Sequence, residues 1–295
     1  MTRAPKRKVS GWIVLDKPAG ISSTQASTRV RHIFNAEKAG HFGTLDPIAT
    51  GVLAVALGEA TKTLPFIQDE TKSYRFEIVF GSATDTGDSE GKITATSDRL
   101  PSLAEVHGMA PKFRGVQTQI PPIYSAIKID GQRAYKLARA GETPEIPSRS
   151  VEITRLEVMS MPAPDRAVLE VDCSKGTYIR SLARDLAQAL DTQGHIGALR
   201  RLRAGPFALD QSVTLDALEK SPMLLPVDAA LGQVPEIFLD SAQAGRVRLG
   251  NPVLLTGRAA PVSLASARAY EGRVLVALGE VSGGQFRPKR LILNG

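Results

Sequence analysis

Residues 41–57 read HFGTLDPIATGVLAVAL, a glycine-rich loop followed by an apolar run. Val52–Leu57 is entirely apolar, which predicts a strand buried on both faces. Gly40–Gly51 contains three glycines and a proline, so we expect it to be mostly loop. Asp46 precedes Pro47, and an Asp in such a loop is usually a turn-former that binds its own backbone.

A functional interpretation of Asp46 competes with that structural one. The loop is long, lies between an expected helix and a buried strand, and carries His41 five residues before the Asp. Loops that a rigid scaffold holds in place often carry functional residues, and glycines let a bound substrate approach the backbone closely. The pattern by itself leaves both interpretations open.

The residues before this loop predict a strand and then a helix. Trp12–Leu15 is a short apolar run that ends in the turn residues DKPAG (16–20). Ser22 and Ser23 are candidate N-caps of the helix that follows. The chain therefore enters the glycine-rich loop from a regular scaffold.

The rest of the chain also divides into strands and helices. We expect strands at Tyr74–Phe80, Lys92–Thr96, Val151–Met159, Ala167–Cys173 and Leu199–Phe207. We expect helices at Glu59–Gln68, Ser102–Lys112 and Arg133–Ala140, and another after Gly176-Thr177. After about Pro235 the chain changes to short strands punctuated by Gly and Pro, so we expect a domain boundary near Val234.

Composition narrows the class of protein. The chain has 295 residues, 42% hydrophobic and 23% charged, as expected for a soluble protein of one large domain or two. No apolar run approaches the ~18 residues of a membrane span. The basic segment Met1–Ser10 is not followed by the apolar stretch and cleavage site of a signal peptide. A lone cysteine, Cys173, and four histidines without ligand spacing predict a cytoplasmic protein without disulfide or metal.

Charge points to a polyanionic partner. The net charge of the chain is +7. Residues 236–295 carry eight basic and four acidic side chains, and so contribute +4 of this net charge. The stretch Lys175–Arg203 carries six basic residues against two acidic ones. Such patches suit nucleic acid, although a basic surface without an RNA role has the same composition.

Six blocks of sequence together resemble one enzyme family. In chain order they are GWIVLDKPAGISS (11–23), HFGTLDPIATG (41–51), Tyr74 with DTGDSEG (85–91), QIPPIYSAIKIDGQRAY (119–135), KGTYIRSL (175–182) and HIGALRR (195–201). From about Gly11 to Phe207 the chain closely resembles the bacterial tRNA pseudouridine-55 synthases, the TruB family. The GTLDPxATG and GTYIRSL blocks in series make this resemblance specific.

The resemblance implies a fold and a domain plan. The fold is an α+β pseudouridine synthase fold with a mixed, largely antiparallel sheet. A catalytic domain spans 1–234, with an insertion at about 122–149 that closes over the RNA. A small β-rich, PUA-like RNA-binding domain follows at 235–295; its assignment depends on position, basic charge and strand pattern because the match is loose there.

The resemblance also implies a reaction. The family converts one uridine in the T-loop of tRNA, at position 55, to pseudouridine: the N1–C1′ bond breaks, the uracil turns over, and C5 bonds to C1′. The family's essential carboxylate corresponds to Asp46, which would stabilise positive charge at C1′ or attack a carbon as a nucleophile. Arg180 corresponds to its cationic partner. No cofactor or metal is implied, and we expect a monomer that binds the tRNA T-arm without a protein partner.

Five further residues take roles from the resemblance. Tyr74 would stack on the target uracil and could move a proton, Tyr178 and Leu199 would line the uridine pocket, and Asp88 would lie near it. His41 would insert into the T-loop and help to extrude the uridine. Ordinary alternatives remain, namely core packing for Tyr74, Tyr178 and Leu199 and an exposed turn for Asp88.

Three basic residues and one apolar residue complete the expectations. Lys17, Lys128 and Arg133 would serve the RNA backbone or the structure. Phe42, which stands between the matched His and Gly, departs from the family pattern, and we interpret it as a tolerated spacer.

Three other functions fit parts of the pattern. The chain could be a pseudouridylase that acts on another RNA, or an RNA chaperone that folds tRNA without chemistry. Intact Asp46, Tyr74 and Arg180 argue against pure binding. A sugar-acting hydrolase that uses Asp46 and Asp88 is disfavoured, because no second carboxylate in the pocket is well motivated.

Overall fold

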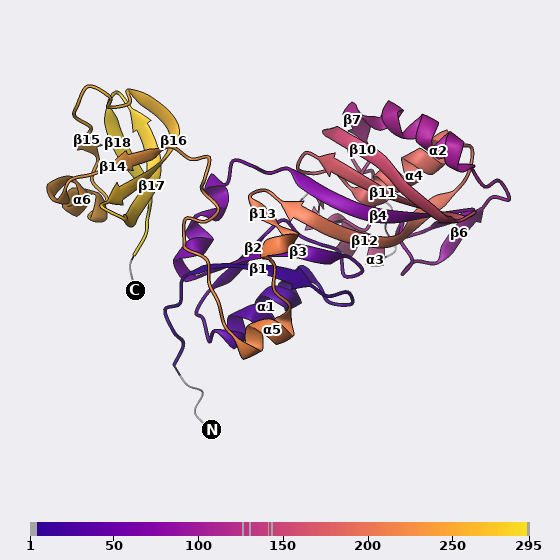
Figure 1. The fold of residues 1–295 in the computed structure, drawn as a ribbon, viewed down its shortest axis with the longest axis horizontal. Coiled ribbons are helices and arrows are strands. Elements are labelled where there is room, and N and C mark those ends of the chain that lie inside the picture. Colours follow the sequence, from indigo (N-terminus) through magenta and orange to yellow (C-terminus); the bar gives the residue numbers. More distant parts are fainter. Residues whose placement is uncertain (1–4, 126, 130, 141, 143, 294–295) are drawn as a thin grey trace. The chain divides into compact units, whose positions relative to one another are not determined.

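The structure is a computed structural model that describes residues 5–125, 127–129, 131–140, 142 and 144–293 (Figure 1). The chain divides into two compact units. The first comprises Met1–Pro47, Gly51–Glu70 and Ala204–Gly295, and the second comprises Ile48–Thr50 and Thr71–Arg203. Each unit therefore combines segments that are far apart in the sequence.

In the first unit, a buried strand pairs with two neighbours. Strand β3 (Thr50–Leu57) is antiparallel to β1 (Gly11–Lys17) and to β2 (Ala39–Phe42). The expected buried strand at Val52–Leu57 is confirmed, since these residues are all fully buried. The expected loop is wrong at its ends, because residues 39–42 satisfy their backbone by pairing with β3 and β3 itself begins at Thr50.

Helical segments of the first unit follow local capping and breaking signals. Helix α1 (Ser23–Ile33) starts at the predicted Ser22, which forms a capping box with Gln25. The helix expected at Glu59–Gln68 is instead two short 3-10 helices, η1 (Gly58–Lys62) and η2 (Leu64–Phe66). Pro65 has no N–H to donate and cannot continue an α-helix. Helices η4 (Leu209–Gln211) and α5 (Leu215–Lys220) follow later in the chain.

The core of this part of the first unit forms around Trp12. Its ring lies 5.1 Å from that of Phe207, and its Nε1 donates a 3.0 Å hydrogen bond to the Val227 carbonyl. Phe42 packs into the same cluster. Successive side chains of a strand point to opposite faces, so Phe42 fills the core while His41, its neighbour on β2, faces away from it.

The second unit is built on strands in the order β12-β4-β11-β10-β7, of which β4, β11, β10 and β7 pair antiparallel with one another in that series. The strands are β4 (Lys72–Phe80), β7 (Gly115–Gln119), β10 (Arg149–Ala163), β11 (Arg166–Cys173) and β12 (Gly194–Ala204). The strands expected at Tyr74–Phe80, Val151–Met159 and Ala167–Cys173 are confirmed. The last strand starts five residues earlier than expected and ends at Ala204, and Phe207–Ala208 forms a separate strand, β13.

Shorter elements complete the second unit. Strand β5 (Ser82–Thr84) pairs antiparallel with β6 (Ile93–Thr96), which confirms the strand expected at Lys92–Thr96, and β8 (Lys128–Ile129) pairs with β9 (Gln132–Arg133). The helices are α2 (Leu103–Met109), η3 (Ala110–Phe113), α3 (Ala134–Arg139) and α4 (Ile179–Ala189), of which α2 contacts β10 and α4 contacts β4. Asp130-Gly131 is a pair typical of hairpin turns, but Asp130 lies outside the described residues, as does Gly141.

The C-terminal part of the first unit has its own sheet, in the order β14-β16-β17-β18-β15. Its elements are β14 (Glu236–Phe238), α6 (Ser241–Arg248), β15 (Val253–Leu254), β16 (Ser263–Glu271), β17 (Val274–Ser282) and β18 (Gln285–Leu291). Phe286, Val276 and Ala269 belong to its core cluster. The β-rich character expected after Pro235 is confirmed, and the fold as a whole is α+β.

Candidate active site

The loop that carries Asp46 is held by buried side chains from α1 and β1. The Ser23 hydroxyl accepts a 2.7 Å hydrogen bond from the Leu45 N–H and donates one of 2.9 Å to the Leu45 carbonyl. On the other side of Asp46, the Pro47 carbonyl accepts from the Gly20 N–H at 2.9 Å. Asp46 itself stays partly exposed. A carboxylate is thus presented on a backbone fixed on both sides.

Lys17 has a buried side chain that hydrogen-bonds to the backbone of the protein. Its side chain is fully buried at the end of β1. Its Nζ donates to the carbonyls of Pro18 and Ile21 at 2.8 Å and of Pro47 at 3.3 Å. Of the two roles expected for Lys17, the structure supports the structural one, because a buried ammonium cannot reach an RNA backbone. The side chains of Lys128 and Arg133 lie outside the described part.

His41 is oriented by two hydroxyl groups. Its Nδ1 lies 3.1 Å from the Ser27 Oγ and its Nε2 lies 3.4 Å from the Thr44 Oγ1. Ser27 also lies 2.8 Å from the Ser23 carbonyl, to which it donates its single proton. This arrangement favours a proton on Nδ1 of His41, with Nε2 as the acceptor.

In the second unit, the structure brings Arg180 and Asp88 together. Arg180 lies in the first turn of α4, and its Nη1 is 3.9 Å from the Asp88 Oδ2. The guanidinium also donates to the Thr86 carbonyl at 2.8 Å and to the Tyr124 carbonyl at 2.9 Å. Both charged side chains are buried. The exposed turn considered for Asp88 is therefore wrong, and Arg180 is not a solvated helix residue.

Asp88 is buried because its turn folds back on itself and on β12. Its Oδ1 accepts from the Thr86 hydroxyl at 2.6 Å and from the Glu90 N–H at 3.2 Å. Asp88 also forms a parallel bridge with Ile196 of β12. Gly87 has φ +75° and lies against the Arg180 side chain, so the turn requires glycine there.

Tyr178 is fixed by hydrogen bonds to its backbone, and its ring faces a guanidinium. Gln119, at the end of β7, accepts from the Tyr178 N–H at 2.8 Å and donates to its carbonyl at 3.1 Å. The Arg149 guanidinium lies 5.5 Å from the centre of the Tyr178 ring. The ring is half-buried and faces a cation, an arrangement that suits an aromatic platform.

Tyr74 and Leu199 are almost fully buried. Tyr74 lies on β4 opposite Val171 of β11, and Leu199 lies on β12. The Leu199 carbonyl lies 3.5 Å from the Thr50 Oγ1. Their burial fits a pocket lining and also fits the core packing considered above.

Sequence reasoning missed the residues that position the candidate groups. Gln119, Thr86 and Tyr124 hold Tyr178 and Arg180 through hydrogen bonds, and Ser23 holds the Asp46 loop. All four lie in blocks quoted for the resemblance, but nothing in their local pattern reveals the partner. Among the described residues, no group of three or more His, Cys, Asp or Glu side chains could hold a metal ion.

Solved structures share this fold. A chain in the "Cbf5-Nop10-Gar1 Complex" superposes with a TM-score of 0.73 at 24% identity, over 96% of this chain and 85% of the other. A chain in "H/ACA RNP bound to a substrate RNA containing 2'-deoxyuridine" gives a TM-score of 0.71 at 22% identity, with the same coverage. At these identities the likeness is one of fold. No helix within the described residues is long and apolar enough to cross a membrane.

Sequence comparisons define the class and then the family. Residues 31–179 match the model of the TruB family pseudouridylate synthase N-terminal domain, and residues 180–232 match that of the tRNA pseudouridylate synthase B C-terminal domain. The "tRNA pseudouridine synthase B" of Brucella anthropi is 48% identical over 100% of both chains, and that of Chelativorans sp. is 47% identical over 99% of both. The class is that of the pseudouridylate synthases. Within it, the chain belongs to the TruB family.

Proposed function

We propose that this enzyme isomerises one uridine in the T-loop of tRNA, at position 55, to pseudouridine. The observation that carries the proposal is the 48% identity over the full length of both chains to a relative named tRNA pseudouridine synthase B. The sequence blocks that resemble the family include HFGTLDPIATG around Asp46 and KGTYIRSL around Arg180. The specific position in the T-loop comes from that resemblance.

Asp46 is proposed as the catalytic carboxylate. The N1–C1′ bond of the uridine breaks, the released uracil turns over, and C5 bonds to C1′ while the proton at C5 is lost and N1 gains one. A carboxylate stabilises positive charge at C1′ or forms a covalent bond with the substrate, as in glycosidases. Support comes from the loop, since Ser23 fixes the backbone at Leu45 and leaves Asp46 partly exposed. A fixed nucleophile lowers the entropy lost in reaching the reactive geometry.

Arg180, Tyr74, Tyr178 and Leu199 are proposed to bind the extruded uridine. Arg180 supplies buried positive charge that favours an ionised carboxylate during turnover. Tyr74 stacks on the uracil, while Tyr178 and Leu199 line the pocket around it. Asp88 acts as a positioning residue, because it lies 3.9 Å from the Arg180 guanidinium.

His41 is proposed to enter the T-loop and help the uridine leave the base stack. Extrusion costs a few kcal/mol, and an inserted imidazole offsets part of that cost. The hydroxyls of Ser27 and Thr44 orient the ring for this role. The basic residues of 175–203 and 236–295 supply the phosphate contacts on which affinity for RNA depends.

The deciding experiment maps pseudouridine in an unmodified tRNA transcript. The transcript is incubated with the protein, derivatised with carbodiimide and read by primer extension. A single stop at T-loop position 55 is expected. A stop at another position would favour the alternative of a different RNA target, and an unmodified transcript would favour a chaperone. We further propose that the enzyme acts as a cytoplasmic monomer, which light scattering on the free protein tests.

A further inference from the structure

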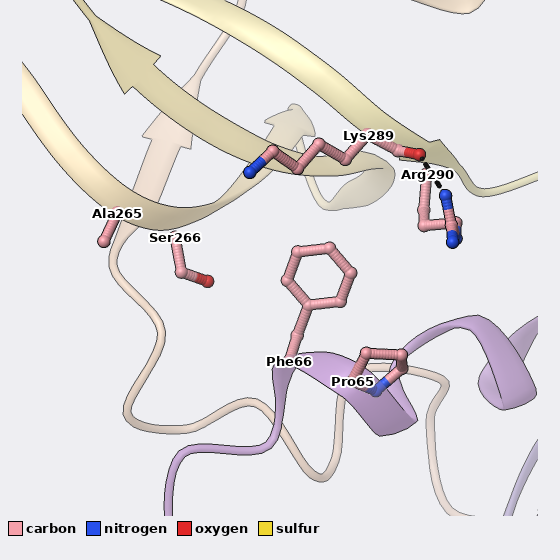
Figure 2. A pocket seen from close by; sticks show the side chains of 6 residues that line it. All are labelled: Pro65, Phe66, Ala265, Ser266, Lys289 and Arg290. Atoms are coloured by element: carbon pink, nitrogen blue, oxygen red, sulfur yellow. Dashed lines mark hydrogen bonds between the residues drawn. The ribbon is translucent and has the colours of Figure 1, made fainter. Parts of the chain in front are cut away.

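A cavity of about 330 Å³ lies between η2 and the C-terminal sheet, within the first unit (Figure 2). Its lining consists of Pro65, Phe66, Ala265, Ser266, Lys289 and Arg290. This volume is at the lower end of the range for small-molecule sites, roughly 300–1,000 Å³. None of these residues takes part in the candidate active site.

Two β-bulges build one wall of the cavity. In β16, the register with β17 shifts between Leu264 and Ala267, which sets Ala265 and Ser266 out of regular pairing. In β18, Lys289 is the extra residue between Pro288 and Arg290. Both bulges lie opposite the same part of β17, at Gly279. Bulges re-aim side chains and are frequent beside functional sites.

The strand geometry at this level depends on Gly279. A Cβ there would collide with the Arg287 carbonyl of β18. The wall is also fastened to the 3-10 helices, because Lys62 donates to the Leu291 carbonyl at 2.8 Å and Glu59 accepts from the Leu293 N–H at 2.6 Å. The cavity is therefore a fixed feature of the first unit.

The chemistry of the lining fits a nucleotide. The Ser266 Oγ is buried and has no hydrogen-bond partner within the described part of the chain, so a ligand would satisfy a group that is otherwise costly to bury. Figure 2 shows the Phe66 ring pointing toward the strands, with Ser266 and Arg290 on either side of it. Lys289 and Arg290 are exposed cations at the rim; the Lys289 Nζ pairs with Glu280 at 2.5 Å and the Arg290 Nη1 donates to the Lys289 carbonyl at 2.8 Å.

We propose that this cavity binds one unpaired nucleotide of an RNA. The base stacks on Phe66, and the phosphate accepts hydrogen bonds from the Ser266 hydroxyl and the two cations. Aromatic stacking and backbone cations together are the usual means by which proteins hold single-stranded nucleic acid. A paired nucleotide has both faces covered by its neighbours in the helix and cannot offer one to Phe66. Residues 236–295 hold eight basic and only four acidic residues, and this positive charge favours RNA over an uncharged ligand.

This inference rests on the proposed function only because it takes RNA as the ligand. The test therefore uses an RNA without uridine, which the proposed reaction cannot modify. The probe is a fluorescein-labelled oligoadenylate of four nucleotides, titrated with the full chain at low salt, with a GC hairpin of matched charge as the paired comparison. We expect the single strand to bind more tightly than the hairpin. We expect Phe66→Leu, which keeps apolar packing, to weaken binding of the single strand about tenfold, and Ser266→Ala and Arg290→Gln to weaken it several-fold.

Lys220→Gln is the matched control, since Lys220 is exposed at the end of α5, lies outside the two basic segments and does not line the cavity. It should change affinity less than twofold. Thermal unfolding of each variant checks folding; if Phe66→Leu unfolds, the near-isosteric Ser266→Ala decides. The proposal is overturned by undetectable binding of the oligoadenylate, by equal affinity for hairpin and single strand, or by cavity variants that match Lys220→Gln. Pseudouridine mapping is independent of all three results, so the two proposals can fail separately.

Discussion

The guanidinium of Arg180 lies 3.9 Å from the carboxylate of Asp88, and their side chains are only 5% and 6% exposed. The two residues are 92 positions apart. Arg180 donates a further hydrogen bond to the Thr86 carbonyl, and Asp88 accepts one from the Thr86 hydroxyl. Removing one partner of a buried ion pair leaves a charge that water cannot reach. The pair therefore links the stability of the second unit to the position of Arg180.

Arg180→Lys is expected to lower both stability and turnover. Lysine cannot reproduce the planar fork that reaches the Thr86 and Tyr124 carbonyls together. Loss of these hydrogen bonds should reduce the free energy of unfolding by about 1–3 kcal/mol and the rate of pseudouridine formation at least tenfold. Urea unfolding and single-turnover kinetics measure the two effects. Unchanged turnover would remove Arg180 from the catalytic group.

Asp46→Asn should abolish pseudouridine formation and leave tRNA binding largely intact. The change is nearly isosteric and removes charge and nucleophilicity, whereas affinity for RNA depends mainly on phosphate contacts. Single-turnover assays and filter binding on the same preparation measure both. Asp98→Asn is a suitable control, because it removes the same charge from an exposed residue between β6 and α2. Turnover within tenfold of the wild type would contradict the catalytic assignment.

His41→Ala should slow the reaction on a folded T-arm by about tenfold or more, and much less on an RNA whose target uridine is already unpaired. The reason is that extrusion costs a few kcal/mol only when the base is stacked. Rates on the two substrates are compared under single-turnover conditions. Equal losses on both would give His41 a general role in the structure of the loop, through Ser27 and Thr44.

Truncation before Pro235 is expected to weaken binding of full tRNA and leave some activity on an isolated T-arm stem-loop. Each lost phosphate contact should flatten the slope of log K against log salt by about 0.9. The truncation also exposes apolar surface, because Phe66, Leu231 and Val234 pack against Tyr270, Leu275, Leu278 and Ile292. A drop in thermal stability is therefore expected as well.

A full-length variant separates these two consequences of truncation. Arg258→Gln with Arg287→Gln removes two exposed charges of the tail and leaves that cluster intact. It should flatten the salt slope without lowering the unfolding temperature. If the truncated protein and the double variant both keep the wild-type slope of log K against log salt, residues 235–295 do not bind RNA. The boundary at 234 would then mark no functional division.

Acid should destabilise the second unit through the polar face of its sheet. Hydrogen bonds from Arg75 hold the pKa of Glu170 below its usual 4.5. Partial burial acts to raise the pKa of Asp172, but the hydrogen bonds from Arg155 and Ser73 and the nearby positive charges together outweigh it, so the pKa lies below its usual 3.8. Because both pKa values are lower in the folded state, this stability is present above about pH 4.5 and is lost as the pH falls through the folded values.

Arg75→Gln should reduce that pH dependence. Arg75 is half exposed, so at neutral pH its loss should cost no more than about 1 kcal/mol. The free energy of unfolding is measured by urea titration between pH 7 and pH 3. Lys112→Gln, which removes a positive charge from an exposed site, provides the comparison. Identical pH profiles for the two variants would contradict the assignment to Glu170.

The sequence by itself determined much of the local structure. The apolar run at Val52–Leu57 and the Ser22 cap predicted β3 and the start of α1, because hydrophobic period and capping chemistry depend on neighbouring residues only. The serial blocks around Asp46 and Arg180 indicated the family, which the comparisons confirm. The roles of individual site residues remain predictions.

Only the tertiary structure decided which polar groups are buried. The sequence left an exposed turn open for Asp88 and a contact with the RNA backbone open for Lys17, yet each is buried against partners from other segments. The unpartnered hydroxyl of Ser266 depends on bulges in two strands and on η2. The burial of a charge or hydroxyl is stable only with partners that the fold brings from far along the chain, and no local pattern of residues encodes those partners.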